Sequence, residues 1–152
     1  VPLEVIMDQI RHIGRDNART PMQWNDEAEA GFTTGRPWLA VNPNHKEINV
    51  EAALADPDSI FYTYQALIAL RKEHPWLVTA DYELVDAADK VFAYKRVEGE
   101  QAYLVVVNLS SQEQELPLVN GVEEVLIANT KVEQVLESGK LAPWDAFCVK
   151  LA

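Results

Sequence analysis

The sequence predicts a mainly β fold, with an antiparallel β-sandwich over residues 77–152 that follows a helical and loop-rich part over residues 1–76. Two observations predict it. A helical pattern of apolar residues ends at Pro75, and short runs rich in β-branched and aromatic residues follow it at nearly even spacing, separated by turn-forming residues. These runs are DYELVD, KVFAYKRV, AYLVVVNLS, QELPL, EEVLIAN and AFCVKLA. The change of pattern places a domain boundary near residues 76–80.

The first part is expected to contain two helices joined by a long loop. Residues 3–12 carry apolar residues in a helical rhythm, whereas residues 21–56 show no sustained period and are expected to form a loop that its aromatic residues pack down. In DPDSIFYTYQALIALRKEHP, Asp56 is expected to cap a helix that begins at Pro57. Its apolar stripe is expected to pack in a core, and consists of Ile60, Phe61, Tyr64, Leu67 and Ile68.

Composition excludes several classes of partner. The formal charge is −11, from 13 basic and 24 acidic residues, which disfavours nucleic acid and anionic membrane surfaces as partners. No apolar run approaches the ~18 residues that a membrane helix needs. Cys148 is the only cysteine, which fits the reducing cytoplasm, and its setting in AFCVKL predicts a buried strand residue rather than a reactive thiol.

The start of the chain, VPLEVIMDQIRH, has no initiator Met and no signal peptide, so we expect a part of a longer protein. No metal or cofactor is expected. His12, His45 and His74 stand alone without a second ligand at metal-binding spacing, and no run of glycines precedes a helix. The paired carboxylates in ELVDAADKV and VEEVL are interpreted as solvated charge, so the chain offers no candidate catalytic residue.

The stretch GRDNARTPMQWND is the strongest candidate for a site. It is too polar for a core strand and too rich in turn residues for a helix, so it is expected to be an ordered loop. Its candidate residues are Arg15, Asp16, Asn17 and Arg19. An arginine fork suits a carboxylate or adjacent sugar hydroxyls, but ion pairs to Asp16, Asp26 or a segment outside the chain explain the arginines equally well.

Three stretches carry a resemblance to a known family. GRDNARTPMQW, AGFTTGRPWLAVNPNHKEINVEAAL and DSIFYTYQALIALRKEHPWL resemble the C-terminal part of α-glucosidases of the α-amylase family, glycoside hydrolase family 13. The resemblance covers essentially the whole chain. It points to the branch that holds oligo-1,6-glucosidase, dextran glucosidase and trehalose-6-phosphate hydrolase, and EVLIANTKVEQVLESGKLAPWDAFCVKL looks most like dextran glucosidase.

The resemblance implies a structural role for each part. Residues 1–57 match the insertion after the eighth strand of a (β/α)8 barrel, residues 58–74 match the last barrel helix, and residues 77–152 match the β-sandwich called domain C. The upstream barrel would then be the intramolecular partner. The position matched by Arg15 reaches the sugar in the −1 subsite, which makes Arg15 the expected substrate-binding residue.

The resemblance also implies that catalysis depends on residues outside this chain. The family hydrolyses with retention, using two aspartates and a glutamate on upstream barrel strands, and no segment here matches those strands. The implied function is hydrolysis of α-1,6-glucosidic bonds at the non-reducing ends of isomalto-oligosaccharides and dextran, in the cytoplasm, by a glucan 1,6-α-glucosidase.

Three alternatives stay open: an α-1,4-glucosidase, a trehalose-6-phosphate hydrolase, or a non-catalytic carbohydrate-binding or structural β-sandwich. Trp144 is the candidate sugar platform of the last alternative, although we expect this side chain to pack instead.

Overall fold

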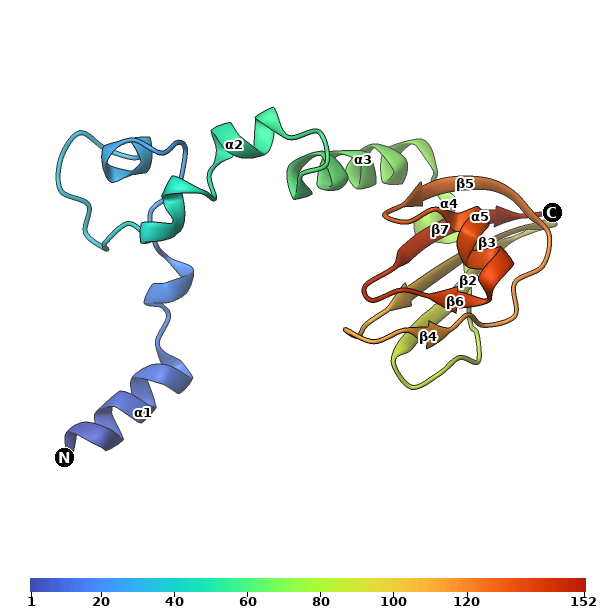
Figure 1. Cartoon of the computed structure of the whole chain (residues 1–152), viewed down its shortest axis with the longest axis horizontal. Coiled ribbons are helices and arrows are strands. Elements are labelled where there is room, and N and C mark those ends of the chain that lie inside the picture. The colour runs from blue at the N-terminus through green and yellow to red at the C-terminus, as the bar shows by residue number, and fades with distance from the viewer. The chain divides into compact units, whose positions relative to one another are not determined.

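The computed structural model describes residues 1–152, with the side chain of Asn17 outside the described structure, and divides them into two compact units, Val1–Gln65 and Ala66–Ala152 (Figure 1). The division lies inside helix α3 (Ile60–Glu73). The predicted boundary between residues 76 and 77 concerns the domains of the family fold and stays a prediction. None of the helices in the described residues is long and apolar enough to cross a membrane.

The first unit contains short helices linked by irregular chain. The predicted N-terminal helix is confirmed as α1 (Leu3–Ile13), which ends where the Gly14 N–H donates to the Ile10 carbonyl at 2.8 Å. The expected long loop is only partly right. It contains two short 3-10 turns, η2 (Ala28–Gly31) and η3 (Pro43–Lys46), and the helix α2 (Val50–Ala55), and a third turn, η1 (Asp16–Ala18), lies before it. The side chain of Asn49 caps α2 by accepting the Ala52 N–H at 2.8 Å.

The predicted start of the next helix is wrong by three residues. Asp56 does not cap α3, because its carboxylate instead accepts the N–H of Asp58 at 2.9 Å and closes a local turn. The Ser59 N–H donates to the Asp56 carbonyl at 3.1 Å within the same turn, and α3 begins at Ile60. A side chain that serves its own turn is not available to a helix that starts further along the chain.

The apolar stripe of α3 is not in a core. Its five residues are 42–85% exposed, with Phe61 at 42% and Ile60 at 85%, so the core role expected for them is wrong for the described chain. Tyr62 and Ala66 lie between the stripe residues, and Ala69 and Leu70 follow them, which leaves α3 apolar on more than one side. A helix of that composition is normally covered on most sides, and the described residues do not provide this cover.

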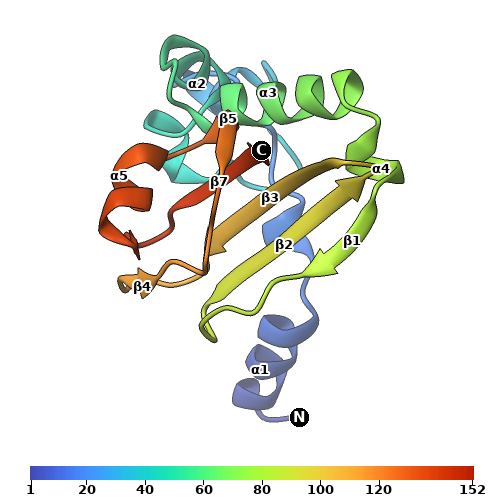
Figure 2. The same cartoon turned by 90° about the vertical axis from the view of Figure 1, so that its right-hand side faces the viewer.

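The second unit is built on one antiparallel sheet of five strands in the order β1-β2-β3-β7-β5 (Figure 2). The strands are β1 (Asp81–Leu84), β2 (Val91–Glu98), β3 (Gln101–Asn108), β5 (Val122–Ala128) and β7 (Ala146–Leu151). A second sheet pairs β4 (Gln114–Glu115) with β6 (Lys140–Leu141). The prediction of an antiparallel β-sandwich is confirmed, since five of the six predicted runs form the large sheet and the sixth contains β4. The sequence analysis did not predict β6.

The main core lies between the large sheet and the short helix α5 (Val132–Ser138) with β6. Alternate residues of the strands supply one side of it. The fully buried members include Leu104, Val106, Val149 and Leu141. Gly139 ends α5 with φ +67, a backbone conformation that glycine adopts without a steric penalty.

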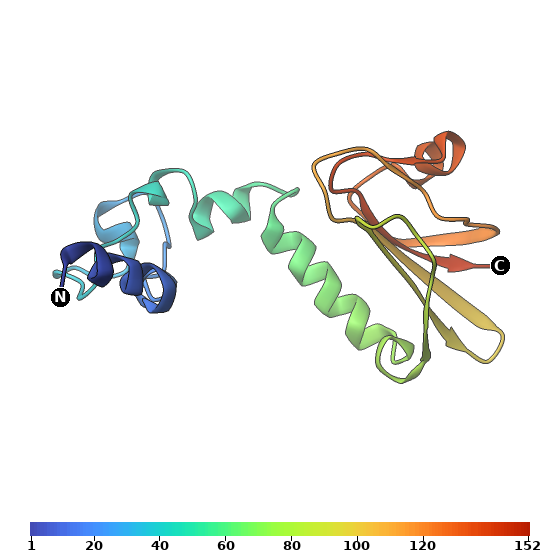
Figure 3. The ribbon, with the colours of Figure 1, turned by 90° about the horizontal axis from the view of Figure 1, so that it is seen from below.

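The opposite face of the sheet is covered in part by the short helix α4 (Trp76–Thr79), where the chain turns at the end of α3 (Figure 3). Trp76 is 4% exposed and lies flat on Tyr103, with ring centroids 3.6 Å apart. Cys148 belongs to the same cluster, and burial raises the pKa of its thiol to about 11. The prediction of a buried strand cysteine is therefore confirmed.

Candidate functional site

Arg15 lies just before the 3-10 turn η1, in the polar loop that the sequence singles out. The turn is closed by main-chain bonds from Ala18 N–H to the Arg15 carbonyl at 3.1 Å and from Arg19 N–H to the Asp16 carbonyl at 3.0 Å. Both arginines and Asp16 are exposed. Asn17, the fourth candidate of this loop, has its side chain outside the described residues.

Ion pairs within the described residues do not hold these arginines. Neither Arg15 nor Arg19 has a carboxylate within 4.0 Å there, although Asp16 and Asp26 were the expected partners. No carboxylate of the described residues therefore uses the planar donor forks of these guanidinium groups.

A left-handed turn follows the polar loop. Glu29 has φ 51 and ψ 26, and Ala30 has φ 54 and ψ 29, in a region that side chains with a Cβ rarely adopt. Gly31 continues the turn with φ +64. The left-handed conformation costs Glu29 and Ala30 about 1–2 kcal/mol each relative to the right-handed one, whereas glycine adopts it freely.

Surrounding bonds hold the strained turn in place. The N–H groups of Trp24 and Asn25 both donate to the Ala30 carbonyl, at 2.9 and 3.3 Å, and the Ala30 N–H donates to the Glu27 carbonyl at 3.0 Å. Ala30 is fully buried, and a Cβ at Gly31 would lie 2.7 Å from Oδ1 of Asn25. These bonds therefore hold the backbone at Glu29 in one conformation. Strain of this kind gathers at functional sites.

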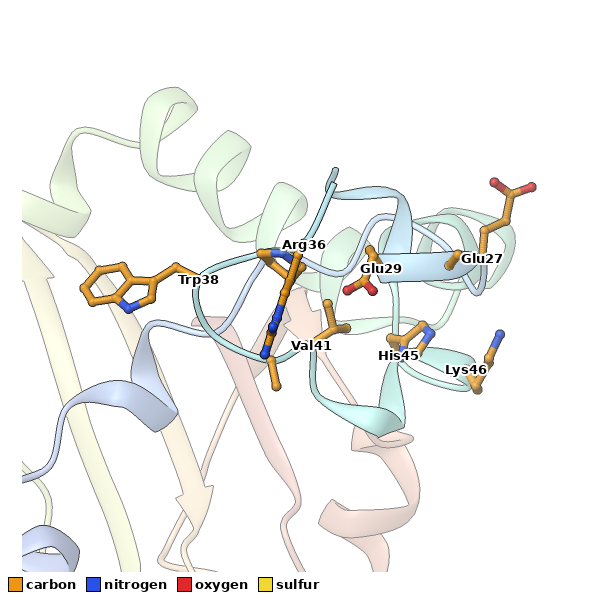
Figure 4. A pocket seen from close by; sticks show the side chains of 10 residues that line it. Glu27, Glu29, Arg36, Trp38, Val41, His45 and Lys46 are labelled. Carbon is orange, nitrogen blue, oxygen red and sulfur yellow. The ribbon is translucent and has the colours of Figure 1, made fainter. Parts of the chain in front are cut away.

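A cavity of about 670 Å3 lies between this turn, the segment around Pro37 and η3 (Figure 4). Its polar lining consists of Glu27, Glu29, Arg36, His45 and Lys46, and its apolar lining of Ala28, Pro37, Trp38, Ala40 and Val41. In Figure 4, Glu29, Val41 and His45 lie close together, Arg36 points down from the loop, and the indole of Trp38 extends away from the charged residues. Its volume falls within the range of ordinary ligand pockets.

The turn η3 orients two of these side chains. Asn42 accepts the Asn44 N–H at 3.2 Å at the start of η3, and Nδ1 of His45 lies 2.9 Å from the Asn42 carbonyl. A carbonyl can only accept, so Nδ1 carries a proton and donates it. Nζ of Lys46 donates to the Asp26 carbonyl. Sequence reasoning assigned no role to Glu29 or Arg36, because the backbone that brings them together is left-handed at non-glycine residues. It expected the aromatic residues of the loop to pack the loop down, which is wrong for the described chain, since Trp38 is 92% exposed.

Trp144 occupies a tight turn before β7 and is 59% exposed, with φ 65. Its N–H donates to the Ser110 carbonyl at 3.2 Å, and its carbonyl accepts from Nδ2 of Asn129 at 2.9 Å. The packing role expected for Trp144 is therefore wrong for the described chain, because the pinned backbone leaves most of the side chain in solvent. Within the described residues, no cluster of three or more His, Cys, Asp or Glu side chains could hold a metal ion.

Comparison with known proteins gives a consistent set of relatives. Residues 3–80 match the family described as "Alpha amylase, catalytic domain", and residues 91–145 match "Alpha-amylase SusG C-terminal domain". The chain is 64% identical over 151 residues to a glucan 1,6-alpha-glucosidase of Streptococcus pneumoniae serotype 4. It is 44% identical over 153 residues to an oligo-1,6-glucosidase of Parageobacillus thermoglucosidasius.

These two alignments cover 99% and 96% of the chain but only 28% and 27% of the relatives. Among solved structures, the isomaltulose synthase of Klebsiella sp. LX3 is similar over 100% of the chain and 28% of its own length, with a TM-score of 0.86 and 38% identity. The chain thus spans little more than a quarter of the length of these three relatives.

Proposed function

The chain belongs to the α-amylase family of glycoside hydrolases, and from this premise we propose that it is part of a retaining α-glucosidase. Its substrates are isomalto-oligosaccharides and dextran, from whose non-reducing ends the enzyme removes glucose by hydrolysing α-1,6 bonds. The observation that carries the proposal is the 64% identity to a glucan 1,6-alpha-glucosidase over 99% of the chain. The identity to an oligo-1,6-glucosidase supports the same linkage.

The two parts of the chain have different roles in this proposal. Residues 1–76 form the end of the catalytic (β/α)8 barrel, and residues 77–152 form the β-sandwich domain C, which covers barrel surface. The exposed apolar sides of α1 and α3 support a barrel as the partner that covers them. The catalytic carboxylates come from the barrel strands of the wider protein.

Arg15 is the residue of this chain that contacts substrate in the proposed enzyme. It binds the terminal glucose, and its fork also pairs with a carboxylate of the barrel. Its exposure, and the absence of an ion pair to Asp16 or Asp26 within the described residues, support this role. The single cysteine supports a cytoplasmic enzyme, because disulfides are rare in that compartment.

The test compares substrates on the enzyme that contains this chain. We expect kcat/KM for isomaltose to exceed the values for maltose and trehalose 6-phosphate by about tenfold or more. The first glucose released should be the α-anomer, as retention requires, and NMR resolves the two anomers. A preference for maltose or trehalose 6-phosphate would show that the enzyme is an α-1,4-glucosidase or a trehalose-6-phosphate hydrolase instead. If no α-glucoside is hydrolysed, the alternative of a non-catalytic β-sandwich is favoured.

A further inference from the structure

The cavity beside the left-handed turn holds charged side chains that are not paired with one another. Glu27, Glu29 and Arg36 line it, and within the described residues none of their side chains has an ion-pair partner within 4.0 Å. Carboxylates that lack a partner are acceptors, and a guanidinium is a fork of donors. Both kinds of group therefore remain available for a ligand that can donate and accept.

The neighbouring turns fix the backbone that carries Glu29 and His45. Glu29 is held by a strained turn whose central carbonyl accepts two main-chain N–H groups, from Trp24 and Asn25. His45 uses Nδ1 for the Asn42 carbonyl, so in the neutral ring Nε2 is left as an acceptor. A site whose backbone is already held in place loses less freedom when a ligand binds than a site on a flexible loop does.

The balance of charge selects the chemistry of the ligand. Glu27 and Glu29 oppose Arg36 and Lys46, and Lys46 is already bonded to the Asp26 carbonyl. A phosphate group would meet two carboxylates in this cavity, which costs free energy, whereas a neutral polyhydroxyl ligand can use donors and acceptors together. Trp38 adds a flat apolar face at the rim, where it is 92% exposed and extends away from the charged side chains (Figure 4).

We propose that this cavity binds one glucosyl unit of an α-glucan chain through Glu29, Arg36 and His45, while the indole of Trp38 covers the ring of the adjacent unit. The proposal rests on the proposed function, because it takes the ligand from the glucan that the enzyme hydrolyses. Arg15 does not line the cavity, so the unit bound there is a different one from the unit at Arg15. Longer glucans therefore gain a contact that a disaccharide reaching only Arg15 does not make.

Direct binding tests the cavity without any hydrolysis. Isomaltotetraose is titrated into the enzyme that contains this chain, inactivated by replacement of its nucleophilic carboxylate. Its tryptophans are 15N-labelled, and the indole N–H signals of Trp38 and Trp144, assigned through Trp38→Phe and Trp144→Phe, are followed by NMR. We expect a saturable shift at Trp38 and none at Trp144, which is also exposed but belongs to the other unit. Trehalose 6-phosphate should bind more weakly than isomaltotetraose. The absence of a shift at Trp38, or an equal shift at Trp144, would overturn the proposal.

Matched variants locate the binding. Glu29→Gln and Arg36→Gln should each raise the Kd by about tenfold, whereas Arg11→Gln, at an exposed arginine of α1 that does not line the cavity, should keep it within about twofold. Unchanged spectra elsewhere show that each variant is folded. Equal affinity of all three variants and the wild type would assign the binding to another surface.

The kinetics of the enzyme that contains the chain provide an independent test of the cavity as a glucan-binding position. Arg36→Gln should lower kcat/KM for dextran by about tenfold more than kcat/KM for isomaltose, and an equal loss on both substrates contradicts the cavity as an additional position. If the enzyme does not hydrolyse α-1,6-glucans, the proposed function is wrong, and the titration alone decides whether the cavity binds glucan. If the enzyme hydrolyses α-1,6-glucans but the Trp38 signal does not respond to isomaltotetraose, only the proposed binding site in the cavity is wrong.

Discussion

The side-chain amide of Asn108, at the end of β3, donates to the main-chain carbonyl of Ala142 at 2.8 Å, across 34 residues of sequence. The same amide donates to the Gln112 carbonyl at 2.8 Å, and its oxygen accepts the N–H of Ser110 at 3.0 Å and the hydroxyl of Ser110 at 2.8 Å. Asn108 is fully buried. Its side chain therefore holds together the turn that follows β3 and the turn that precedes β7.

Replacing Asn108 should therefore destabilise the second unit strongly. Asn108→Ala removes the buried amide that joins the turn at Ser110 to Ala142 and leaves the Ser110 N–H without its acceptor, so we expect the free energy of unfolding to fall by about 2–4 kcal/mol. The matched control is Asn120→Ala, at an exposed asparagine, which should change it by less than about 0.5 kcal/mol. Urea unfolding followed by far-UV circular dichroism measures both, and equal effects would contradict a structural role for the Asn108 network.

The positive φ of Trp144 predicts an unusual order of stability. At this position Trp144→Gly should be more stable than Trp144→Ala by about 1 kcal/mol, because glycine adopts φ 65 without strain and alanine does not. At Leu118, which is exposed and has no positive φ, the order should reverse. Thermal melts of the four variants decide it, and an alanine advantage at both positions would show that Trp144 is unstrained.

The burial of Cys148 predicts a loss of stability at alkaline pH. The folded thiol has a pKa of about 11, whereas an unfolded cysteine titrates near 8.5. Between these values the unfolded chain has released the proton that the folded chain keeps, so the free energy of unfolding falls as pH rises.

The contribution of Cys148 is complete below about pH 8 and is lost towards pH 11, by about 3 kcal/mol at most. Chemical unfolding of the wild type and of Cys148→Ala at several pH values isolates this effect from other titrating groups. The difference between the two proteins should shrink as pH rises, and a constant difference would contradict the prediction.

Arg15 and Arg19 should respond differently to lysine in the complete enzyme. Lysine keeps the charge but loses the planar fork, so Arg15→Lys should lower kcat/KM on isomaltose by about 30- to 1000-fold, equivalent to about 2–4 kcal/mol. Arg19→Lys should have a much smaller effect. If Arg19→Lys abolishes activity while Arg15→Lys stays within about threefold of the wild type, the sugar contact belongs to Arg19.

Residues 1–152 alone should hydrolyse neither isomaltose, dextran nor p-nitrophenyl α-glucoside. Retaining hydrolysis needs a nucleophile and an acid/base carboxyl group about 5–5.5 Å apart, and the matching segments of the family are not found in this sequence. Glucose release is measured beside a preparation from cells that lack the protein. Glucose release above that background would contradict the proposal that the catalytic carboxylates lie outside residues 1–152.

Sequence patterns predicted the strands well and the short elements poorly. β2, β3 and β7 alternate or run apolar over six to eight residues, long enough for a period to show. α5 was missed, although Val132, Val135 and Leu136 have helical spacing and Gly139 follows as a helix end. α2 has six residues, fewer than two turns, and its only signal was Asn49.

The site was predictable only in part. The polar loop at Arg15 stood out because its composition is unusual over a few consecutive residues. The cavity did not, because it depends on Glu29 and Ala30 in a left-handed conformation that sequence rules reserve for glycine. The exposure of the apolar stripe of α3 could not be predicted from the sequence either. The helical spacing of apolar residues shows which side of a helix is apolar, but not which part of the protein packs against that side.

The stacking of Trp76 on Tyr103 gives the protein a built-in optical reporter. Of the four tryptophans, Trp24, Trp38 and Trp144 are 50%, 92% and 59% exposed, whereas Trp76 is 4% exposed, with its ring 6° from parallel to that of Tyr103. Iodide should therefore quench the emission of three indoles and spare the blue-shifted emission of the fourth. The protected signal reports one event, the docking of α4 on the sheet, so stopped-flow fluorescence with iodide present can time that step without any added dye.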